Sequence, residues 1–206
     1  MKYKQFFITG IGTEVGKTIV SAVFCKALES YYWKPIQAGD LDQSDSIKVK
    51  NLVKTVNIIP EIVRLQTPAS PHFSAEKEGI FITEKDFNLP KIKGALIIEG
   101  AGGLMVPINK EGFLFIDLII KWKLPVILVV KHYLGSINHS LLSIEVLKSK
   151  NITPKLIVFT GEKNLSSEQI IHRLHPNIPS YSIPFCSQID NYFIENEGEK
   201  LKQFLI

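Results

Sequence analysis

Two residues with the chemistry to bind a phosphate chain lie side by side near the start of the sequence. Lys17 and Thr18 follow Gly16, at the end of a loop that also contains Gly10 and Gly12. Glycines let consecutive backbone N–H groups turn toward one centre, and the start of a helix adds partial positive charge there. A lysine in this place reaches the terminal phosphates, and a threonine hydroxyl ligates the accompanying magnesium. The stretch therefore predicts a site for a nucleotide with magnesium.

The spacing of this loop departs from the commonest phosphate-binding pattern, which has four residues between its first glycine and Gly-Lys-[Ser/Thr]. Here five residues separate Gly10 from Gly16, and three separate Gly12 from it. A glycine-rich turn that binds nothing is the alternative. The apolar run before the loop and the helical pattern after it favour the nucleotide site.

Two further charged residues stand at the ends of predicted strands. Residues 94–98 form an apolar run that ends at Glu99 and continues into a glycine-rich loop. A short strand from residue 31 ends at Lys34, because the residue before a proline is pushed to extended geometry. Ligands of parallel sheets lie beyond the carboxyl ends of the strands, so both side chains are expected beside the glycine loop. Glu99 would hold magnesium directly or through water, whereas a plain surface lysine is the alternative for Lys34.

Three aspartates, Asp40, Asp42 and Asp45, come soon after Lys34. Any of them could face the magnesium, and a solvated acidic loop is the alternative. Residues 66–75 contain two prolines and small polar side chains, which predict an irregular loop. His72 in this loop has no histidine or cysteine at ligand spacing, so a metal-binding role is not favoured.

Hydrophobic periodicity predicts the strands and helices that must position these residues. Strands are expected over 6–9, 31–34, 94–98, 125–130, 155–160 and 180–184, and helices over 19–28, 113–122, 134–149, 166–175 and 193–206. A strand, helix, strand order makes neighbouring strands parallel. The sequence thus predicts a P-loop NTPase-like three-layer α/β/α fold with a mostly parallel central sheet, in one domain over residues 1–206.

Composition is that of an ordinary globular chain. The 206 residues are 45% hydrophobic and 21% charged, and the net charge of +4 is small and scattered, which does not indicate nucleic-acid binding. No run is long enough to span a bilayer, and no targeting segment is recognised. Cys25 and Cys186 lack metal or redox spacing, and Cys25 is expected in the core. We therefore expect a cytoplasmic protein that binds neither membrane nor nucleic acid.

The long predicted helix over 134–149 opens with Leu-Gly-Ser-Ile-Asn-His. Its first-turn N–H groups could bind an anion. Capping or packing is the ordinary role of Asn138 and His139, and the pattern alone favours that role.

Six motifs, in order from residue 9 to residue 184, resemble the dethiobiotin synthetase family of biotin biosynthesis. They are residues 9–18 (Thr-Gly-Ile-Gly-Thr-Glu-Val-Gly-Lys-Thr), 34–39 (Lys-Pro-Ile-Gln-Ala-Gly), 70–72 (Ser-Pro-His), 99–103 (Glu-Gly-Ala-Gly-Gly), 134–139 and 183–184 (Ile-Pro). The family's loop has the same five-residue spacing. The first and fourth motifs together are specific, and the resemblance covers nearly the whole chain.

The resemblance implies an ATP- and magnesium-dependent ring closure on 7,8-diaminononanoate (diaminopelargonate). One amine takes up CO2 as a carbamate, which attacks the γ-phosphate to give a carbamic-phosphoric anhydride. The second amine then closes the ureido ring, and ADP and phosphate are released. Because several negative charges meet, magnesium and two lysines must offset their repulsion.

The resemblance also implies roles for the matching residues. Catalytic residues would be Lys17, Lys34 and Thr13. The nucleotide would contact Gly12, Thr13, Glu14, Val15, Gly16, Lys17, Thr18, Glu99, Gly102, Thr160, Asn164, Ile183 and Pro184. Magnesium would be held by Thr18, Asp45 and Glu99, and the substrate by Thr13, Lys34, Ala38, Pro71, Gly135, Ser136, Ile137 and Asn138. The last four would come from the partner chain of a homodimer with its sites at the interface.

Two departures from the family pattern leave alternatives open. The acidic metal ligand usually lies in a Ser-Asp pair, here residues 44–45, but the connector is short, so Asp40 and Asp42 remain alternatives. The family commonly reads adenine with an asparagine where this chain has Thr160. Either Asn164 replaces it from the loop, or base selectivity is loose.

A switch ATPase of the partition or cell-division type, with the same fold, is the alternative function. Such proteins place a second lysine five residues before the P-loop lysine, where this chain has Gly12. A glutamine-dependent amidotransferase would need a further catalytic-cysteine domain and is not expected.

Overall fold

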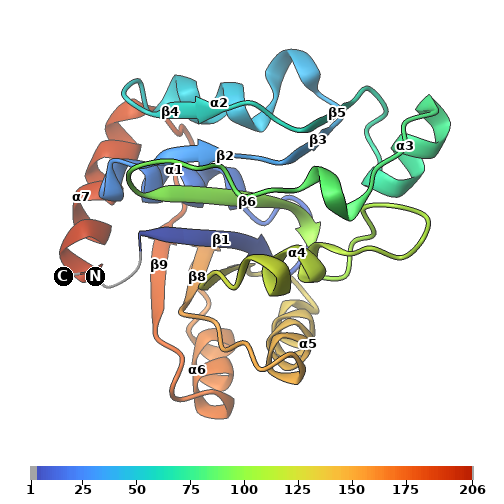
Figure 1. Ribbon diagram of the computed structural model, residues 1–206. Helices are drawn as coiled ribbons and strands as arrows, with labels where there is room; N and C mark the ends of the chain where they lie inside the picture. Colours follow the sequence, from blue (N-terminus) through green and yellow to red (C-terminus); the bar gives the residue numbers. More distant parts are fainter. Residues whose placement is uncertain (1–3, 206) are drawn as a thin grey trace.

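The computed structural model describes residues 4–205 (Figure 1). The strands are β1 Gln5–Gly10, β2 Tyr31–Trp33, β3 Ile36–Ala38, β4 Asn57–Ile59, β5 Val63–Leu65, β6 Leu96–Gly103, β7 Val126–Lys131, β8 Leu156–Gly161 and β9 Ser180–Pro184. The α-helices are α1 Lys17–Leu28, α2 Asp45–Leu52, α3 Pro71–Glu78, α4 Phe115–Trp122, α5 Ser136–Ser149, α6 Leu165–Leu174 and α7 Asn191–Leu205. Two 3₁₀ turns are η1 Leu41–Gln43 and η2 Glu84–Asp86.

Seven strands form the central sheet in the order β4-β2-β6-β1-β7-β8-β9, and each neighbouring pair is parallel. Strands β3 and β5 form a separate parallel pair. From β1 the chain moves outward to β2 and β4 on one side, and after β6 it moves to β7, β8 and β9 on the other. The loop after β1 therefore lies at the switch point, where ligands of open parallel sheets bind.

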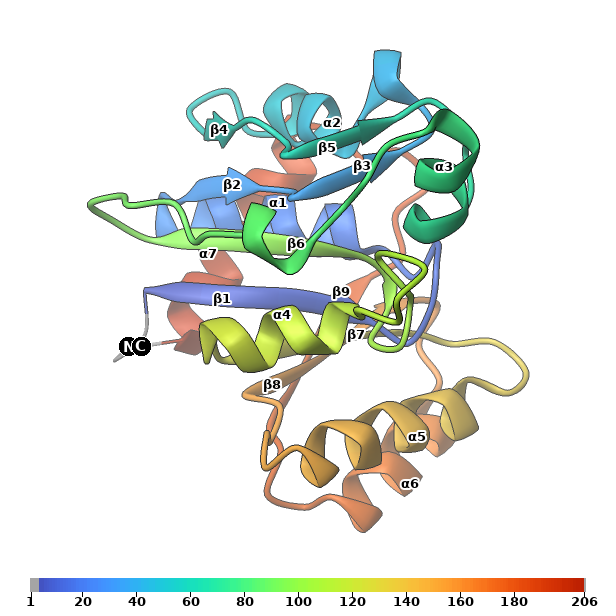
Figure 2. The same ribbon diagram turned by 45° about the vertical axis from the view of Figure 1, so that its right-hand side comes forward.

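Neighbouring residues of β1 pack into opposite layers. The ring of Phe6 lies 6.2 Å from that of Phe24 in α1, whereas the ring of Phe7 lies 6.1 Å from that of Trp122 in α4. Side chains alternate between the two faces of a strand, so α1 and α4 cover opposite faces of the sheet. Figure 2 shows α1 and α7 behind the sheet and α4 and α5 in front of it. The predicted three-layer α/β/α fold with a parallel sheet is confirmed.

Two segments depart from the sequence predictions. The predicted irregular loop over 66–75 is wrong in its second half, because α3 begins at Pro71. Proline suits the first position of a helix, where a backbone N–H would have no partner within the helix. The polar stretch after Lys34 includes α2, whose N-cap Ser44 accepts a hydrogen bond from the Ile47 N–H at 3.4 Å. The last residue of the predicted C-terminal helix, Ile206, lies outside the described residues.

Cys25 is in the core, as predicted, and burial raises the pKa of its thiol to about 12. Across residues 4–205, no helix combines the length and the apolar character needed to cross a membrane.

Candidate nucleotide and metal site

The loop after β1 closes around the side chain of Lys17. A Cβ at Gly10 would lie 2.5 Å from the Val15 side chain, so the loop packs this tightly only around a glycine. Gly16, with a φ of 89°, is the N-cap of α1, and no side chain of the described residues caps that helix. Its first-turn N–H groups are therefore available to an anion. The Lys17 ammonium donates a hydrogen bond of 2.7 Å to the carbonyl of Gly12.

Lys17 is buried, and its pKa is shifted in consequence. The pKa of Lys17 is lowered to about 8, chiefly by burial; the charges of Glu99 and Asp45 oppose this shift, and the charge of Lys34 adds to it. Burial penalises the charged form of a lysine, and a neighbouring anion restores it. A polyphosphate bound in the loop would therefore favour the protonated ammonium.

Glu99, in β6, is 1% exposed and accepts four hydrogen bonds. Its Oε2 atom accepts from Ser21 Oγ at 2.7 Å and from the Tyr32 hydroxyl at 2.9 Å. Its Oε1 atom accepts from Thr18 Oγ1 at 3.0 Å and from Lys34 Nζ at 3.3 Å. A buried carboxylate needs such partners, because an unpaired charge in the interior is very costly.

The Lys34 ammonium lies between two carboxylates. It donates a short hydrogen bond to Asp45 and a second hydrogen bond to Glu99. Burial alone would lower the pKa of Lys34, but the charges of Glu99 and Asp45 raise it above its usual value. Burial alone would likewise raise the pKa of Asp45, but Lys34 lowers it. The pair therefore holds the Lys34 ammonium and the Asp45 carboxylate in their charged forms at neutral pH.

Oxygen atoms of Thr18, Asp45 and Glu99 meet beside the phosphate loop, around a position that already holds a cation, the ammonium of Lys34. Hydroxyl and carboxylate oxygens are the hard ligands that magnesium prefers, so the donor set fits that ion. No cluster of three or more His, Cys, Asp or Glu side chains with metal-binding geometry occurs in the described part of the chain. Magnesium here would therefore take its other ligands from phosphates and water. Asp40 and Asp42 are exposed at η1.

The glycine run at the end of β6 packs against the phosphate loop. Gly102 has a φ of 66°, and a Cβ there would lie 3.7 Å from Thr13 Oγ1. A Cβ at Gly103 would lie 3.4 Å from the carbonyl of Gly10, with which Gly103 is paired in the sheet. The predicted loop after Glu99 is thus an extension of the strand, and this extension places Thr13 beside Gly102.

A cavity of about 270 Å³ opens at the carboxyl ends of β8 and β9. Three of the predicted nucleotide residues, Thr160, Ile183 and Pro184, line it together. His132 also lines it, with its ring stacked 5.3 Å from the ring of Phe159. The cavity lies next to the phosphate loop, since a Cβ at Gly16 would touch Thr160 at 3.4 Å.

The two candidate base-reading residues already have partners within the protein. The Thr160 hydroxyl donates to the carbonyl of Val15 at 2.8 Å, so it ties β8 to the phosphate loop. Asn164 is exposed and caps α6, where its side-chain oxygen accepts from the Ser167 N–H at 3.0 Å. The structure thus brings Thr160 to the cavity and uses the Asn164 oxygen elsewhere.

Helix α5 begins without a side-chain cap among the described residues. Its N-cap, Gly135, has a φ of 103°, and a Cβ there would meet nothing within 4 Å. Leu134 is fully exposed, and Asn138 is exposed as well. The hydrogen bonds around Glu99 involve no residue of α5.

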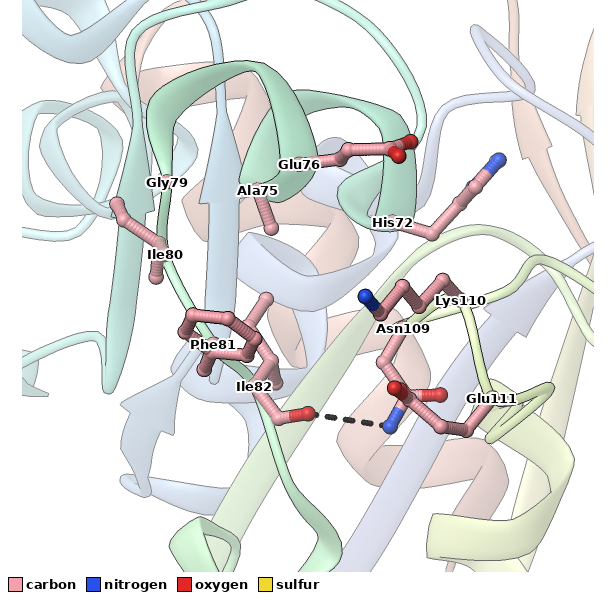
Figure 3. Close-up of a pocket in the computed structure, with 10 residues that line it drawn as sticks. All are labelled: His72, Ala75, Glu76, Gly79, Ile80, Phe81, Ile82, Asn109, Lys110 and Glu111. Carbon is pink, nitrogen blue, oxygen red and sulfur yellow. Dashed lines mark hydrogen bonds between the residues drawn. The ribbon is translucent and has the colours of Figure 1, made fainter.

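A second cavity, of about 240 Å³, lies between α3 and two loops (Figure 3). Asn109 bridges its two sides by donating to the carbonyl of Ile82 at 3.1 Å, and the Lys110 ammonium lies 5.7 Å from the centre of the Phe81 ring. His72 lines this cavity, but its ring points away from Phe81 (Figure 3). None of the lysines and carboxylates around Glu99 lines this cavity, so it is separate from the phosphate site.

The two partners of Glu99 Oε2, Ser21 and Tyr32, were not predicted from the sequence. Ser21 lies one helical turn after Lys17 and therefore on the same face of α1, and this spacing could have predicted its place near the site. No local signal marks Tyr32, because its role depends on the pairing of β2 with β6.

A parallel sheet whose first strand leads through a glycine loop to a helix opening on Gly-Lys-Thr defines a P-loop nucleotide-binding protein. A family model described as "AAA domain" matches residues 4–191. The ATP-dependent dethiobiotin synthetase BioD of Christiangramia forsetii is 53% identical over 173 residues, 83% of each chain. The protein of that name from Afipia carboxidovorans is 48% identical over 173 residues, 82% of each chain. This chain belongs to the dethiobiotin synthetase family, the ATP-dependent ligases of biotin biosynthesis.

The fold extends beyond this family. A plasmid partition protein from Borrelia burgdorferi superposes with a TM-score of 0.60 at 12% identity, over 100% of this chain and 99% of that one. At such identity the likeness shows the fold alone. The chain therefore shares only its fold with partition-type switch ATPases, whereas its relatives by sequence favour the ligase.

Proposed function

We propose that this chain, acting as one α/β domain, converts 7,8-diaminononanoate, CO2 and ATP into dethiobiotin, ADP and phosphate. The observation that carries the proposal is the buried Lys34, held between Asp45 and Glu99 directly beside the phosphate loop of Lys17. Two ammonium groups at one sheet edge suit a reaction that joins an anionic carbamate to a triphosphate. Membership of the family supports the same reaction.

The chemistry divides into two bond-forming steps. A carbamate oxygen attacks the γ-phosphorus, the bond to the ADP oxygen breaks, and a carbamic-phosphoric anhydride forms. The second amine then attacks the carbonyl carbon, phosphate leaves with the bridging oxygen, and the ureido ring closes. Lys17 would serve the β- and γ-phosphates, while Lys34 and Thr13 would hold the carbamate and the transferring group.

Thr18, Asp45 and Glu99 would hold magnesium, which supplies charge neutralisation at the phosphates. The same carboxylates bind Lys34 in the structure. A second cation at these oxygens would repel the ammonium, and Lys34 would then be free to turn toward an anionic substrate. We infer that Lys34 serves two partners in turn, first the carboxylates and then the carbamate.

The substrate carboxylate needs an anion site at some distance from the phosphates, because the diamine is a long aliphatic chain. The uncapped start of α5, with open space at Gly135, suits this role. We propose that Gly135, Ser136, Ile137 and Asn138 of one chain bind the carboxylate in its partner's site, in a homodimer. Ala38, the last residue of β3, and Pro71, the first residue of α3, would flank the aliphatic part.

The cavity at β8 and β9 would take the base of ATP, between Ile183, Pro184 and Thr160. The Thr160 hydroxyl is engaged with the carbonyl of Val15. We therefore propose that the shape of the cavity, rather than hydrogen bonds from a side-chain amide, selects the base, which leaves the selectivity among nucleotide bases loose.

Both cysteines are free, which suits a reducing compartment such as the cytoplasm.

Product analysis tests the proposed function. The purified chain is incubated with diaminopelargonate, bicarbonate, magnesium and ATP, and dethiobiotin is measured by mass spectrometry alongside phosphate. The proposal predicts one phosphate per dethiobiotin and no phosphate above background without the diamine. Phosphate release that ignores the diamine and responds to DNA or lipid would instead indicate a switch ATPase.

A further inference from the structure

Tyr32 is a fully buried tyrosine whose hydroxyl reaches the carboxylate of the nucleotide site. It is 0% exposed, and its hydroxyl donates to Glu99 Oε2 at 2.9 Å. The register of the sheet explains the contact. Tyr32 pairs with Ile97, which lies two residues before Glu99 and so on the same face of the sheet. A long aromatic side chain reaches such a diagonal neighbour.

The two oxygens of Glu99 have different surroundings. Oε2 accepts from Tyr32 and from Ser21, two neutral hydroxyl groups within the core. Oε1 accepts from Thr18 and Lys34, the P-loop hydroxyl and the ammonium. Two donors occupy the two lone-pair directions of Oε2, so the carboxylate has one oxygen held by the core and one that faces the site.

We propose that Tyr32, together with Ser21, is a positioning residue that fixes the Glu99 carboxylate so that only Oε1 is presented to the cation of the nucleotide site. The proposal rests on the magnesium role of Glu99 in the proposed function. It adds that Glu99 acts through a single oxygen, whose direction is set from within the core.

The packing of its ring also suits Tyr32 to this task. The ring itself packs in the apolar cluster with Ile97 and Phe6. A phenylalanine would therefore keep this packing and remove only the hydrogen bond.

The test compares the parent chain with Tyr32→Phe, Ser21→Ala and the control Tyr181→Phe. Tyr181 lies in β9, where burial and the nearby carboxylate of Glu197 raise the pKa of its hydroxyl, so Tyr181→Phe removes the same group beside a different carboxylate. Mn²⁺ is the metal probe, and its binding is followed by electron paramagnetic resonance with a non-hydrolysable ATP analogue present. Affinity for the analogue without metal and the melting temperature are measured in parallel.

We expect Tyr32→Phe and Ser21→Ala each to weaken Mn²⁺ binding about tenfold, the effect of losing one partner of a metal-binding carboxylate. Analogue affinity without metal should stay within about twofold of the parent value, and Tyr181→Phe should bind Mn²⁺ normally. The positioning role is overturned if Tyr32→Phe binds Mn²⁺ as tightly as the parent, whatever its melting temperature. It is also overturned if the parent binds no Mn²⁺.

The outcomes separate this inference from the proposed function. If the parent chain makes dethiobiotin and Tyr32→Phe binds Mn²⁺ as tightly as the parent, the proposed reaction stands and the positioning role is rejected. If the parent chain makes no dethiobiotin, but Tyr32→Phe binds Mn²⁺ about tenfold more weakly than the parent, the positioning role stands and the proposed reaction is rejected.

Discussion

Two neighbouring lysines show how partners decide the state of a buried charge. Lys17 and Lys34 are both buried, yet burial lowers the pKa of Lys17 to about 8, whereas two carboxylates raise that of Lys34 against the effect of its burial. Lys17 donates to a neutral carbonyl, and Lys34 donates to two anions. The lysine without a direct anionic partner is the one expected to gain most from a bound polyphosphate.

Nucleotide affinity should therefore fall at high pH. The folded-state pKa of Lys17 is depressed, so its charge is present below about pH 8 and is lost as the pH rises through that value. Phosphates bind the charged form, and each pH unit above the pKa should cost about tenfold in affinity. Calorimetric titration of an ATP analogue between pH 7 and pH 10 measures this, with proton uptake on binding at the upper end. A Lys17→Met chain should bind weakly with a flat profile, and a parent profile that is equally flat would contradict the assignment.

Replacement of Lys34 should mainly affect turnover. Lys34→Ala removes one electrostatic stabiliser and should lower kcat by about two orders of magnitude. Lys48→Ala is the matched control, since Lys48 also lies near Asp45, at 3.6 Å, but on the exposed side. The control should retain near-parent turnover. Near-parent turnover in Lys34→Ala would remove Lys34 from the mechanism.

Glu99→Gln should keep the fold and raise the magnesium requirement. A neutral amide is a poorer ligand for a hard cation than a carboxylate. Lys34 would also lose one of its two anionic partners. Magnesium titrations of turnover compare this variant with the parent, and superimposed curves would show that Glu99 is structural.

At the scale of elements, turns hold the site residues in place. Gly39 directly follows β3 and has a φ of 74°, and a Cβ there would lie 2.5 Å from Pro68. Gly79, the C-cap of α3, has a similar φ of 66° but open space around it. Gly79→Ala should lower the free energy of unfolding by about 1 kcal/mol, because alanine is strained in the left-handed conformation. Gly39→Ala should lower it by about 1–3 kcal/mol more, because of the clash with Pro68. Chemical denaturation measures both values, and equal losses would show that Pro68 moves aside at little cost.

Long apolar elements were predictable from the sequence, and short polar ones were not. The apolar runs of β1, β6 and β7 are short and are bounded by turn residues, and the amphipathic α4 has a clear helical period, so the position and type of these elements follow directly. Helices α2 and α3 lack an apolar stripe, and β3 and β5 have three residues each, so tertiary contacts decide them. The places of Lys34 and Glu99 at the ends of predicted parallel strands were enough to predict that their side chains lie close together. The contacts of Ser21 and Tyr32 with Glu99 depend on long-range pairing and gave no comparable signal.

At the scale of the whole molecule, the proposed homodimer should share its sites. A chain with Lys17→Ala and a chain with Gly135→Asp are each expected to be inactive, the second because a carboxylate would repel the substrate at the start of α5. In a mixed dimer, one of the two sites combines both intact halves. Mixing should therefore restore activity above either parent variant. Mixed dimers that form but stay inactive would show that each chain completes its own site.

The most direct measurement of the central claim follows one oxygen atom. The enzyme is supplied with diaminopelargonate, magnesium-ATP and ¹⁸O-labelled bicarbonate, and the released phosphate is analysed by mass spectrometry. If the carbamate attacks the γ-phosphate, the bridging oxygen leaves with the phosphate, so each dethiobiotin formed should be matched by one ¹⁸O-labelled phosphate. Dethiobiotin accompanied by unlabelled phosphate, or phosphate released without the diamine, would contradict the account.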